Sequence, residues 1–541
     1  MSFSEVLHGG QAAAEQQQRS PVLMMALLVA VSYLFYRLTV PPSSLKTPKT
    51  SQIVASPSTF PFYGLGSTQF YSDRWGFLRR WQGDAHKDDP LLEKRAVRCN
   101  CSNKVLITSH GADAAETFFH DRNLSFSKGY SVMFAGIPQL PAWLHRRSET
   151  EVHLQDDEQR HFFQTQLKLA TNSQRLDQLL PQMFEDSFAR FAKLPKEGGL
   201  MDMHKVIYPL IFQISVRNLA LAEDARDEKR CHLIEKHFWA FQDYSGFFQT
   251  HFPLLPLPGT IKRWYGIIRL TMLLKEGIES RRREGRREDD HIQTMIDAGH
   301  DTQRMINFII GGLFAAIINT TGMLAWTLVL IAADPPILAR VREELDDFLR
   351  KEAEARGDEF DELSVEEQLS RVPIESWESN LPYFDACLKE TMRYLNISVL
   401  FRAYDPKKKG SAPTVYGGEQ LREGEYVSFW LAGTHLNPDI YPNPLTYDPD
   451  RYFVRKEGSG PNEFLGWGAG LHPCTGMRFA KLEIKTCASC FLRTFPDYKP
   501  VDLDGNPYNR DNVPLPDLDS EHRRFPDKPL ALAYTRRFSP R

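Results

Sequence analysis

The segment with the clearest potential for chemistry is a glycine-rich loop that carries a cysteine and leads directly into a predicted helix. Its sequence, Phe464-Leu-Gly-Trp-Gly-Ala-Gly-Leu-His-Pro-Cys-Thr-Gly476, places Cys474 near the end of the loop. Glycines let backbone N–H groups approach a sulfur atom closely, and the N-terminus of a helix favours a negative charge. Because both effects favour a thiolate, the pattern predicts that Cys474 is an anionic ligand rather than a structural cysteine.

A second group of charged residues lies upstream of this loop. Glu390 and Arg393 are three residues apart on one face of a predicted helix, and alone they indicate a surface ion pair. A segment rich in proline and aromatic residues follows at 435–452 and contains Arg451. The order of these motifs along the chain is the basis of the resemblance described below.

The composition limits the classes of function. The chain has 541 residues, which predicts either two or three domains or one large enzyme fold. The 66 Lys and Arg residues against 69 Asp and Glu residues leave no basic excess, so nucleic-acid binding is disfavoured. Seven scattered cysteines, an odd number, indicate a reducing compartment rather than a disulfide framework.

An apolar run near the N-terminus predicts attachment to a membrane. Residues 22–36 are apolar apart from Ser32, and the run approaches the roughly 17 to 20 residues that a helix needs to cross a bilayer. A cleaved signal peptide is the alternative, but the mostly polar residues before the run favour an anchor. Lys and Arg are more frequent after the run than before it, so the positive-inside rule keeps the rest of the chain in the cytosol.

We expect four segments along the chain. These are an N-terminal tail (1–20), a transmembrane anchor (21–40), a Pro/Ser linker (41–61) and a catalytic domain (62–541). A linker of this composition is typical of a hinge between an anchor and a folded domain.

Most of the region 156–450 has helical periodicity, whereas strand-like segments such as Val105–Thr108 and Tyr426–Trp430 are short. The longest expected helix, Met305–Ala333, carries no formal charge. Its hydropathy is compatible with a second membrane span. A helix that is apolar on all sides is equally typical of the core of a large domain.

Together the motifs resemble those of the cytochrome P-450 superfamily, the haem-thiolate enzymes, over about residues 60–538. The family signature is an aromatic residue, Gly-x-Gly, a basic residue, and Cys-x-Gly; its matches here are Trp467, Gly468, Gly470, His472, Cys474 and Gly476. Tryptophan stands where the family usually has phenylalanine. The resemblance implies that Cys474 is the axial ligand of the iron in haem b (iron protoporphyrin IX) and that His472 contacts a haem propionate. It also implies that Glu390, Arg393 and Arg451 form a buried structural lock.

The same resemblance places the long apolar helix over the distal face of the haem. The oxygen-handling motif of the family is small-Gly-x-acid-Thr-Thr/Ser, and residues 316–321 read Ala-Ile-Ile-Asn-Thr-Thr. Thr320 and Thr321 match the motif, whereas Asn319 replaces the acid and Ile317 the glycine. An amide can position water but cannot titrate, so the departure affects the step that delivers protons.

Asn319, and Arg402 nine residues after Arg393, make the chain similar to the branch that contains sterol 7-alpha-hydroxylases and prostacyclin synthase. The former use O2 and NADPH, whereas the latter rearranges an endoperoxide without either. By this comparison Arg402 is a second propionate contact. Residues expected beside the substrate are Leu313, Ala316, Ser398 and Val399, together with Thr320. The aromatic stretch 238–256 is expected either to roof the pocket and dip into the membrane or to pack as helix core.

The expected fold class is mainly α with a small β subdomain, the cytochrome P-450 fold, preceded by a single N-terminal transmembrane helix. The expected function is a monooxygenase that hydroxylates a hydrophobic small molecule, such as a terpenoid, a sterol or another lipid-like secondary metabolite, with O2 and reductase-delivered electrons. Expected partners are an NADPH-cytochrome P-450 reductase, with cytochrome b5 as a further candidate, and the endoplasmic reticulum membrane. The alternative is a reductase-independent isomerase or dehydratase that rearranges a peroxide. A non-catalytic haem-binding protein is disfavoured by Thr320, Arg402 and Cys474.

Overall fold

The computed structural model describes most of the chain outside the N-terminal region. The described residues are 24–25, 28–29, 31–33, 35–36, 53–55, 67–82, 96–101, 104–133, 149–243, 257–396, 398–406, 412–516, 526 and 528–535. They fall into two compact units. Residues 1–109, 123–129 and 401–429 make up the first unit, and residues 110–122, 130–400 and 430–541 make up the second.

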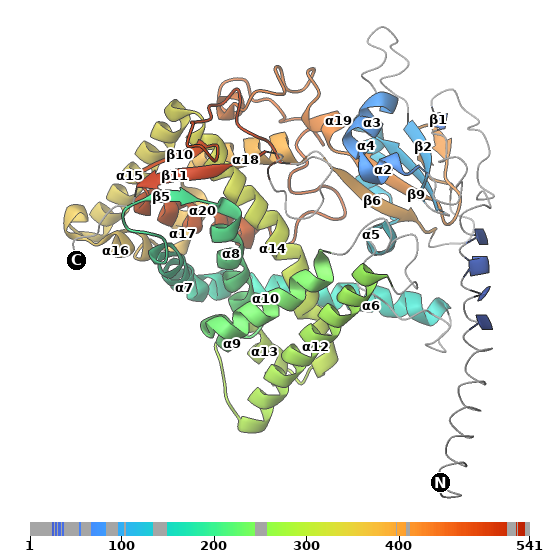
Figure 1. Ribbon diagram of the computed structural model, residues 1–541, viewed down its shortest axis with the longest axis horizontal. Coiled ribbons are helices and arrows are strands. Elements are labelled where there is room, and N and C mark those ends of the chain that lie inside the picture. The colour runs from blue at the N-terminus through green and yellow to red at the C-terminus, as the bar shows by residue number, and fades with distance from the viewer. Residues whose placement is uncertain are drawn as a thin grey trace, which may run out of the picture. The chain divides into compact units, whose positions relative to one another are not determined.

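Within the predicted anchor, the described residues between Met24 and Tyr36 are helical and have exposed side chains (Figure 1). The rest of the predicted tail and anchor, and nearly all of the linker, lie outside the described residues. The predicted boundaries of these segments therefore stay predictions.

Helices dominate the second unit. In chain order the labelled helices among the described residues are α2 (Gln69–Ser72), α3 (Arg74–Gln82), α4 (Ala112–His120), α5 (Phe126–Met133), α6 (Glu149–Ala170), α7 (Ser173–Ala192), α8 (Met203–Leu219), α9 (Ala222–Arg226), α10 (Glu228–Gln242), α12 (Pro258–Glu284), α13 (His291–Asp297), α14 (Thr302–Ala332), α15 (Pro335–Arg356), α16 (Val365–Ser370), α17 (Ile374–Ser379), α18 (Pro382–Leu395), α19 (Ala432–His435) and α20 (Met477–Thr494), with short 3-10 turns at Phe360–Glu362 and Pro449–Tyr452.

Strands are short and few by comparison. They are β1 (Ile53–Ala55), β2 (Ala96–Cys101), β3 (Lys104–Ser109), β4 (Leu124–Ser125), β5 (Gly199–Met201), β6 (Val399–Tyr404), β7 (Val415–Tyr416), β8 (Glu419–Gln420), β9 (Tyr426–Trp430), β10 (Asp497–Val501) and β11 (Ala531–Thr535). A six-stranded sheet has the order β1-β2-β3-β9-β6-β4, and a three-stranded sheet has the order β10-β11-β5. The two strands predicted from the sequence are confirmed as β3 and β9, which pair in parallel. The expectation of a mainly helical fold with a small sheet region is also confirmed.

The long helix α14 forms the centre of the second unit (Figure 1). The Asp301 side chain begins it by accepting a hydrogen bond from the N–H of Arg304 at 3.0 Å. Its first half packs in a hydrophobic cluster with α8, α10 and α12, and its second half packs with α7, α18 and α20. Among the described helices α14 alone is long and apolar enough to cross a membrane, but 72% of its most apolar window is buried in protein. The core interpretation of this helix is therefore the correct one.

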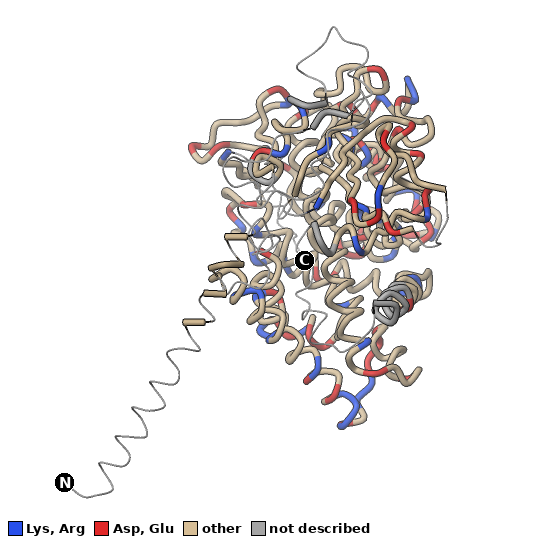
Figure 2. The backbone as a smooth tube through the Cα atoms, turned by 90° about the vertical axis from the view of Figure 1, so that its right-hand side faces the viewer, with Lys and Arg blue, Asp and Glu red and all other residues tan. Residues whose placement is uncertain are grey.

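The charge-dense stretch at residues 279–290, which by its sequence is typical of a solvated helix end and loop, contains a buried ion pair. The Arg281 guanidinium is buried and donates to the Asp290 carboxylate at 2.8 and 2.6 Å. Asp290 also accepts the backbone N–H of Ala222 at 3.0 Å, so it links α9 to the end of α12. Basic and acidic segments lie close together at this tip of the unit, as Figure 2 shows. The mixed signs seen in the sequence thus include one buried structural ion pair.

Candidate functional site

The cysteine loop of the second unit has a backbone that only glycine adopts easily. Gly468 and Gly470 have φ angles of +71° and +59°. A Cβ atom at Gly470 would lie 2.2 Å from the backbone oxygen of Phe119, and that same oxygen accepts the N–H of Leu471 at 2.9 Å. The loop therefore docks against the end of α4, and the glycines permit this close approach.

Cys474 lies between this loop and α20. Its backbone N–H donates to the oxygen of Trp467 at 2.7 Å, which closes the loop, and α20 begins at Met477. Loss of water around the thiol raises the pKa of Cys474, and the N–H of Gly476, which favours the thiolate, opposes this shift. The backbone N–H that the sequence analysis expected to stabilise the thiolate is therefore present.

Exposure separates Cys474 from the other cysteines. All seven lie among the described residues and all are free, yet Cys474 is the exposed one, whereas the rest are buried or half-buried. Burial raises the pKa of Cys231 to about 12 and that of Cys387 well above its usual range. Cys487 and Cys490 are buried in the core. Cys474 is thus the thiol best placed to meet a ligand from outside the polypeptide.

Glu390, Arg393 and Arg451 meet in the second unit, and all three are fully buried. The Glu390 carboxylate accepts Nε and Nη2 of Arg393 at 2.8 and 2.7 Å and Nε of Arg451 at 3.0 Å. It also accepts the hydroxyl of Tyr452 at 2.9 Å and the backbone N–H of Asp448 at 3.1 Å. The three side chains of the predicted lock therefore meet at the Glu390 carboxylate, and the buried Glu457 carboxylate also pairs with the Arg451 guanidinium.

The two arginines of the lock hold the backbone of the segment at 435–452. Nη1 of Arg393 donates to the oxygens of His435 and Pro444, each at 2.8 Å, and Nη2 of Arg451 donates to the oxygen of Thr446 at 3.0 Å. The two arginines therefore donate hydrogen bonds to backbone carbonyl groups of an irregular segment, in which helix or sheet hydrogen bonds do not satisfy these groups.

The faces of α14 differ in exposure. Phe314, Ala315 and Asn319 are exposed, whereas Leu313 and Thr320 are buried. Leu313 packs in the cluster with α8, α10 and α12. The expected place of Leu313 and Thr320 beside a substrate stays a prediction.

The remaining residues of this prediction divide between the two faces of α14. Ala316 is half-buried, and Thr321 is fully buried with no hydrogen-bond partner for its hydroxyl among the described residues. A helix that is apolar all round gives no pattern from which to choose a face, because several rotations would bury similar apolar area. Asn319 is consequently the exposed polar residue of the 316–321 motif.

The other predicted contacts have the following positions. Arg402 belongs to the first unit, is buried, and places its guanidinium carbon 4.7 Å from the centre of the Phe126 ring. In the second unit, Ser398 is half-buried and Val399 is buried at the start of β6. Their distance from a bound substrate is not defined by these contacts.

The structure describes the first part of the aromatic stretch 238–256. Phe238 and Phe241 are buried in the helix cluster of α10 and α12, which supports the core interpretation for these two residues. The segment 244–256 lies outside the described residues, so its predicted role as a pocket roof stays a prediction.

Two residues that the sequence analysis missed support the site. The Glu344 carboxylate accepts the backbone N–H groups of Tyr383 and Phe384 at 2.7 and 2.9 Å and so caps the helix of the lock. The imidazole of His435, at the first position of the proline-rich segment, contacts the beginning of the cysteine loop through Leu465. The sequence did offer a signal for His435, which is the first residue of the proline-rich segment. It offered none for Glu344, because Glu344 lies in an ordinary amphipathic helix.

The donor set fits a haem better than a bare metal ion. Among the described residues there is no group of three or more His, Cys, Asp and Glu side chains that could hold a metal by itself. A porphyrin supplies four ligands and needs a single protein thiolate, which Cys474 can provide. A Cβ atom at Gly476 would meet no described atom within 4 Å, so there is open space beside the loop.

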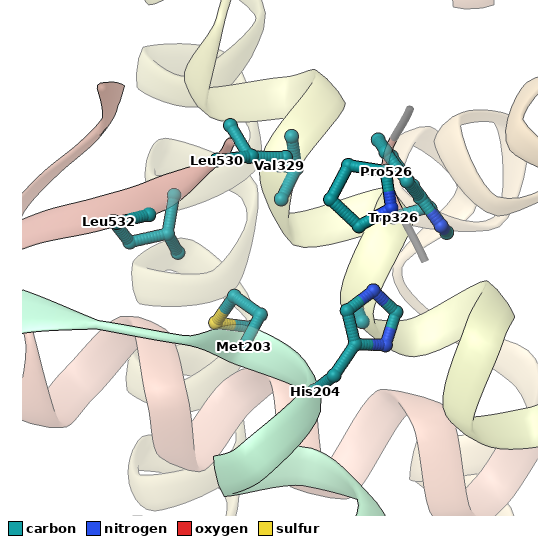
Figure 3. A pocket seen from close by; sticks show the side chains of 9 residues that line it. Met203, His204, Trp326, Val329, Pro526, Leu530 and Leu532 are labelled. Atoms are coloured by element: carbon teal, nitrogen blue, oxygen red, sulfur yellow. The ribbon is translucent and has the colours of Figure 1, made fainter. Parts of the chain in front are cut away.

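A small cavity lies elsewhere in the second unit. Its lining comes from the start of α8, the second half of α14 and β11, with Pro526 and Leu530. His204 points toward the gap between Met203 and Trp326, with Pro526 beside them (Figure 3). None of the lining residues belongs to the cysteine loop, so this cavity is distinct from the candidate site.

Comparisons with known proteins identify the family. A family model described as cytochrome P450 matches residues 94–508. The chain is 27% identical to the cytochrome P450 monooxygenase AacuE of Aspergillus aculeatus, over 84% of this chain and 87% of that protein. It is 25% identical to lanosterol 14-alpha demethylase of Cunninghamella elegans, over 63% of this chain and 67% of that protein.

The fold is shared with a solved structure as well. The structure of retinoic acid bound cyanobacterial CYP120A1 matches with a TM-score of 0.63 and 19% identity, over 92% of this chain and 100% of that one. This likeness shows the fold, and the match to the family model shows the relationship in sequence. The chain belongs to the cytochrome P450 family of haem-thiolate oxidoreductases.

Proposed function

We propose that this protein is a membrane-bound monooxygenase that hydroxylates a hydrophobic small molecule, with Cys474 as the iron ligand. The observation that carries the proposal is the exposure of Cys474 alone among seven free cysteines, on a glycine loop at the start of α20. The lanosterol demethylase among the relatives acts on a sterol by its name, which supports a lipophilic substrate.

The residues that would hold haem b come from the cysteine loop and from β6. Cys474 would bind the iron, and His472 and Arg402 would contact the propionates. Gly468, Gly470 and Gly476 would let the backbone lie close to the porphyrin, with Trp467 beside it. When bound, haem iron supplies the activation of O2 with electrons that a reductase takes from NADPH.

The polypeptide itself would orient the substrate, exclude water and manage protons. Phe314, Ala315 and Ala316 of α14, with Ser398 and Val399, would form an apolar wall next to the reacting carbon. The Asn319 amide can accept a hydrogen bond at Oδ1 and donate one at Nδ2, so it can hold a water molecule for proton transfer without titrating itself. Buried Thr320 and Thr321 would support the helix rather than touch the oxygen.

Asn319 variants test this assignment of the α14 face. We expect Asn319→Ala to lower the product formed per NADPH consumed by about 10- to 100-fold, because the ordered water is lost. Thr320→Val, which keeps the side-chain shape on the buried side, should change this coupling less than twofold. Simultaneous measurement of NADPH consumption and product formation checks both. A larger loss for Thr320→Val than for Asn319→Ala would return the role to Thr320.

A rearranging enzyme is the second candidate, and the open amide of Asn319 favours it. A carbon monoxide difference spectrum separates the two: protein in membranes is reduced either by NADPH with a P-450 reductase or by dithionite as the control. A thiolate-type Soret band with the enzymatic reductant supports the monooxygenase. A band with dithionite alone, together with product formation under anaerobic conditions, supports the isomerase. No thiolate-type band under either reductant, from folded haem-loaded protein, would refute Cys474 ligation.

The proposed location is the endoplasmic reticulum membrane, with residues 21–40 as a single-pass anchor and a cytosolic catalytic domain over 62–541. The proposed electron donors are an NADPH-cytochrome P-450 reductase and, as a second candidate, cytochrome b5. The exposed apolar side chains between Met24 and Tyr36 support the anchor.

A surface of α12 supports contact with lipid. Ile261, Tyr265, Ile268 and Met272 follow one face of the helix, and each is more than half exposed. No Asp or Glu occurs from 258 to 275, whereas Lys262, Arg269 and Lys275 do. An apolar stripe with basic neighbours is typical of a helix that lies in the membrane interface.

Site-specific labelling tests this contact. A fluorophore attached to Ile268→Cys in the membrane-bound holoprotein should be quenched by lipid-borne quenchers and protected from aqueous ones. The matched variant Glu279→Cys, on the charged half of the same helix, should show the reverse pattern. Equal quenching of the two positions by the aqueous quencher would show that α12 stays in water.

A further inference from the structure

The imidazole of His435 joins two parts of the second unit that are distant in sequence. His435 ends α19 and is fully buried. Its Nδ1 lies 3.0 Å from the backbone oxygen of Asn396, and its Nε2 lies 3.0 Å from the backbone nitrogen of Leu465. Asn396 is the residue that follows α18, and Leu465 lies near the beginning of the cysteine loop.

These two contacts allow one protonation state of the ring. The Asn396 oxygen can only accept, so Nδ1 must carry a proton and donate it. The Leu465 N–H can only donate, so Nε2 must be unprotonated and accept. The neutral Nδ1–H tautomer satisfies both partners. The other neutral tautomer would place two acceptors against each other at Asn396 and two donors against each other at Leu465. The charged ring would place two donors against each other at Leu465.

The same residue is attached to the lock through its backbone. Its carbonyl oxygen accepts Nη1 of Arg393 at 2.8 Å, and its ring stacks on Phe464 at 5.8 Å between centroids and 23° between planes. Arg393 in turn pairs with Glu390. His435 therefore links α18 and the lock on one side with the first residues of the cysteine loop on the other.

Hydrogen bonds continue from Leu465 toward the cysteine. The Leu465 oxygen accepts the N–H of Gly468 at 3.0 Å, and the Trp467 oxygen accepts the N–H of Cys474 at 2.7 Å. The N–H that His435 accepts and the carbonyl that Gly468 donates to belong to the two neighbouring peptide groups of Leu465, so the His435 contact holds the residue that anchors the turn presenting the thiol. A shift of Leu465 would displace the acceptor of Gly468 and loosen the loop.

The surroundings keep the ring neutral. Burial lowers the pKa of His435 to about 4; the Asn396 carbonyl opposes this shift, and the positive charge of Arg393 adds to it. The charged groups near it are Arg393 with its partner Glu390, both on α18, and Lys389, whose Nζ lies 4.9 Å from the centre of the Phe464 ring. Two of these three groups are cations, which also disfavours a charged imidazole.

We propose that His435 is a positioning residue for Cys474, which holds the cysteine loop through its Nδ1–H tautomer so that the sulfur binds iron as a thiolate. This inference rests on the proposed function, because it assumes that Cys474 is the iron ligand. His435 touches neither substrate nor cofactor, and it acts through Leu465.

His435→Phe keeps a flat ring on Phe464 and removes both hydrogen bonds. Two readouts follow: hydrogen exchange at the Leu465 and Gly468 amides, and the share of carbon monoxide complex with a thiolate-type rather than a thiol-type Soret band. We expect exchange at these amides to rise at least tenfold and most of the holoprotein to convert to the thiol-type band. His435→Gln can place one acceptor near Leu465, so it should recover part of the thiolate-type band.

His291→Phe is the matched control for loss of a buried neutral histidine. Its Nε2 lies 3.0 Å from the Gln166 side-chain oxygen, and burial lowers the pKa of His291 to about 4, but its contacts are not with the cysteine loop. It should reduce stability while leaving both readouts unchanged. If His291→Phe shifts the band as much as His435→Phe, the effect is general destabilisation and the proposal is wrong.

Other outcomes are also decisive. Unchanged exchange at Leu465 and an unchanged thiolate-type band in His435→Phe would overturn the proposal. If His435→Phe does not fold, His435→Gln with the same two readouts decides. If the unaltered protein itself gives no thiolate-type band, the proposed function fails, and exchange at Leu465 still tests whether His435 holds the loop.

Discussion

Replacing Cys474 with serine is expected to remove the thiolate-type carbon monoxide band and to reduce hydroxylation below detection. A serine hydroxyl stays protonated near neutral pH, so the iron would lose its anionic protein ligand. The electron density that a thiolate pushes toward the iron, which favours cleavage of the O–O bond, would be lost with it. The exposed position of Cys474 means that the substitution leaves no buried polar group unsatisfied. The polypeptide should therefore stay folded, as circular dichroism would show.

Cys231→Ser is the control for this experiment. Cys231 is half-buried on α10 and is free, and it plays no part in the cysteine loop. This variant should keep the thiolate-type band and the activity of the unaltered protein. A normal band in Cys474→Ser, or loss of the band in Cys231→Ser, would mean that the iron ligand has been misassigned.

Replacing Glu390 with glutamine is expected to lower the free energy of unfolding of the holoprotein substantially. The carboxylate compensates the charge of Arg393 and shares that of Arg451 with Glu457, and Glu390 and both arginines are fully buried. Removing one partner of a buried ion pair costs about 3 to 5 kcal/mol, because the remaining charge stays buried without compensation. The amide nitrogen would also face donors, so hydrogen bonds from Tyr452 or Asp448 would be lost.

Urea unfolding of the holoprotein measures this loss, and haem release on dilution gives a second readout. A loss of this size is a large part of the 5 to 15 kcal/mol that stabilises a typical domain, so failure to accumulate folded protein is the extreme form of the same result. Glu228→Gln makes the same chemical change at an exposed pair with Lys193 and should leave unfolding almost unchanged. A Glu390→Gln protein that unfolds within about 1 kcal/mol of the unaltered one would show that the lock is dispensable.

Short-range patterns predicted the parts of the site that lie within a few residues of one another. The cysteine loop and its helix, and the pair Glu390 and Arg393, follow from residue types at fixed offsets. Helical and strand periodicity predicted β3, β9 and the long helix α14. These features depend on local backbone geometry, which the sequence encodes directly.

Long-range relations required the tertiary structure. The meeting of Arg451 with Glu390 entered the sequence analysis through a family resemblance, and the structure places the atoms 3.0 Å apart. The burial of Arg281 with Asp290 within a stretch that reads as solvated loop was not visible in the charge pattern. Neither could the sequence show that His435 contacts Leu465, because nothing in the spacing of the two residues specifies that contact.

The sequence by itself determined the family, the cysteine that would bind iron, the mainly helical class and the apolar character of α14. The tertiary structure decided which side of α14 is buried: Leu313 and Thr320 are buried, whereas Ala315 and Asn319 are exposed. The physical reason is that α14 is apolar on all sides, so its own sequence gives no preferred rotation. The neighbouring helices α8, α10 and α12 bury one side of its first half and leave the other side exposed.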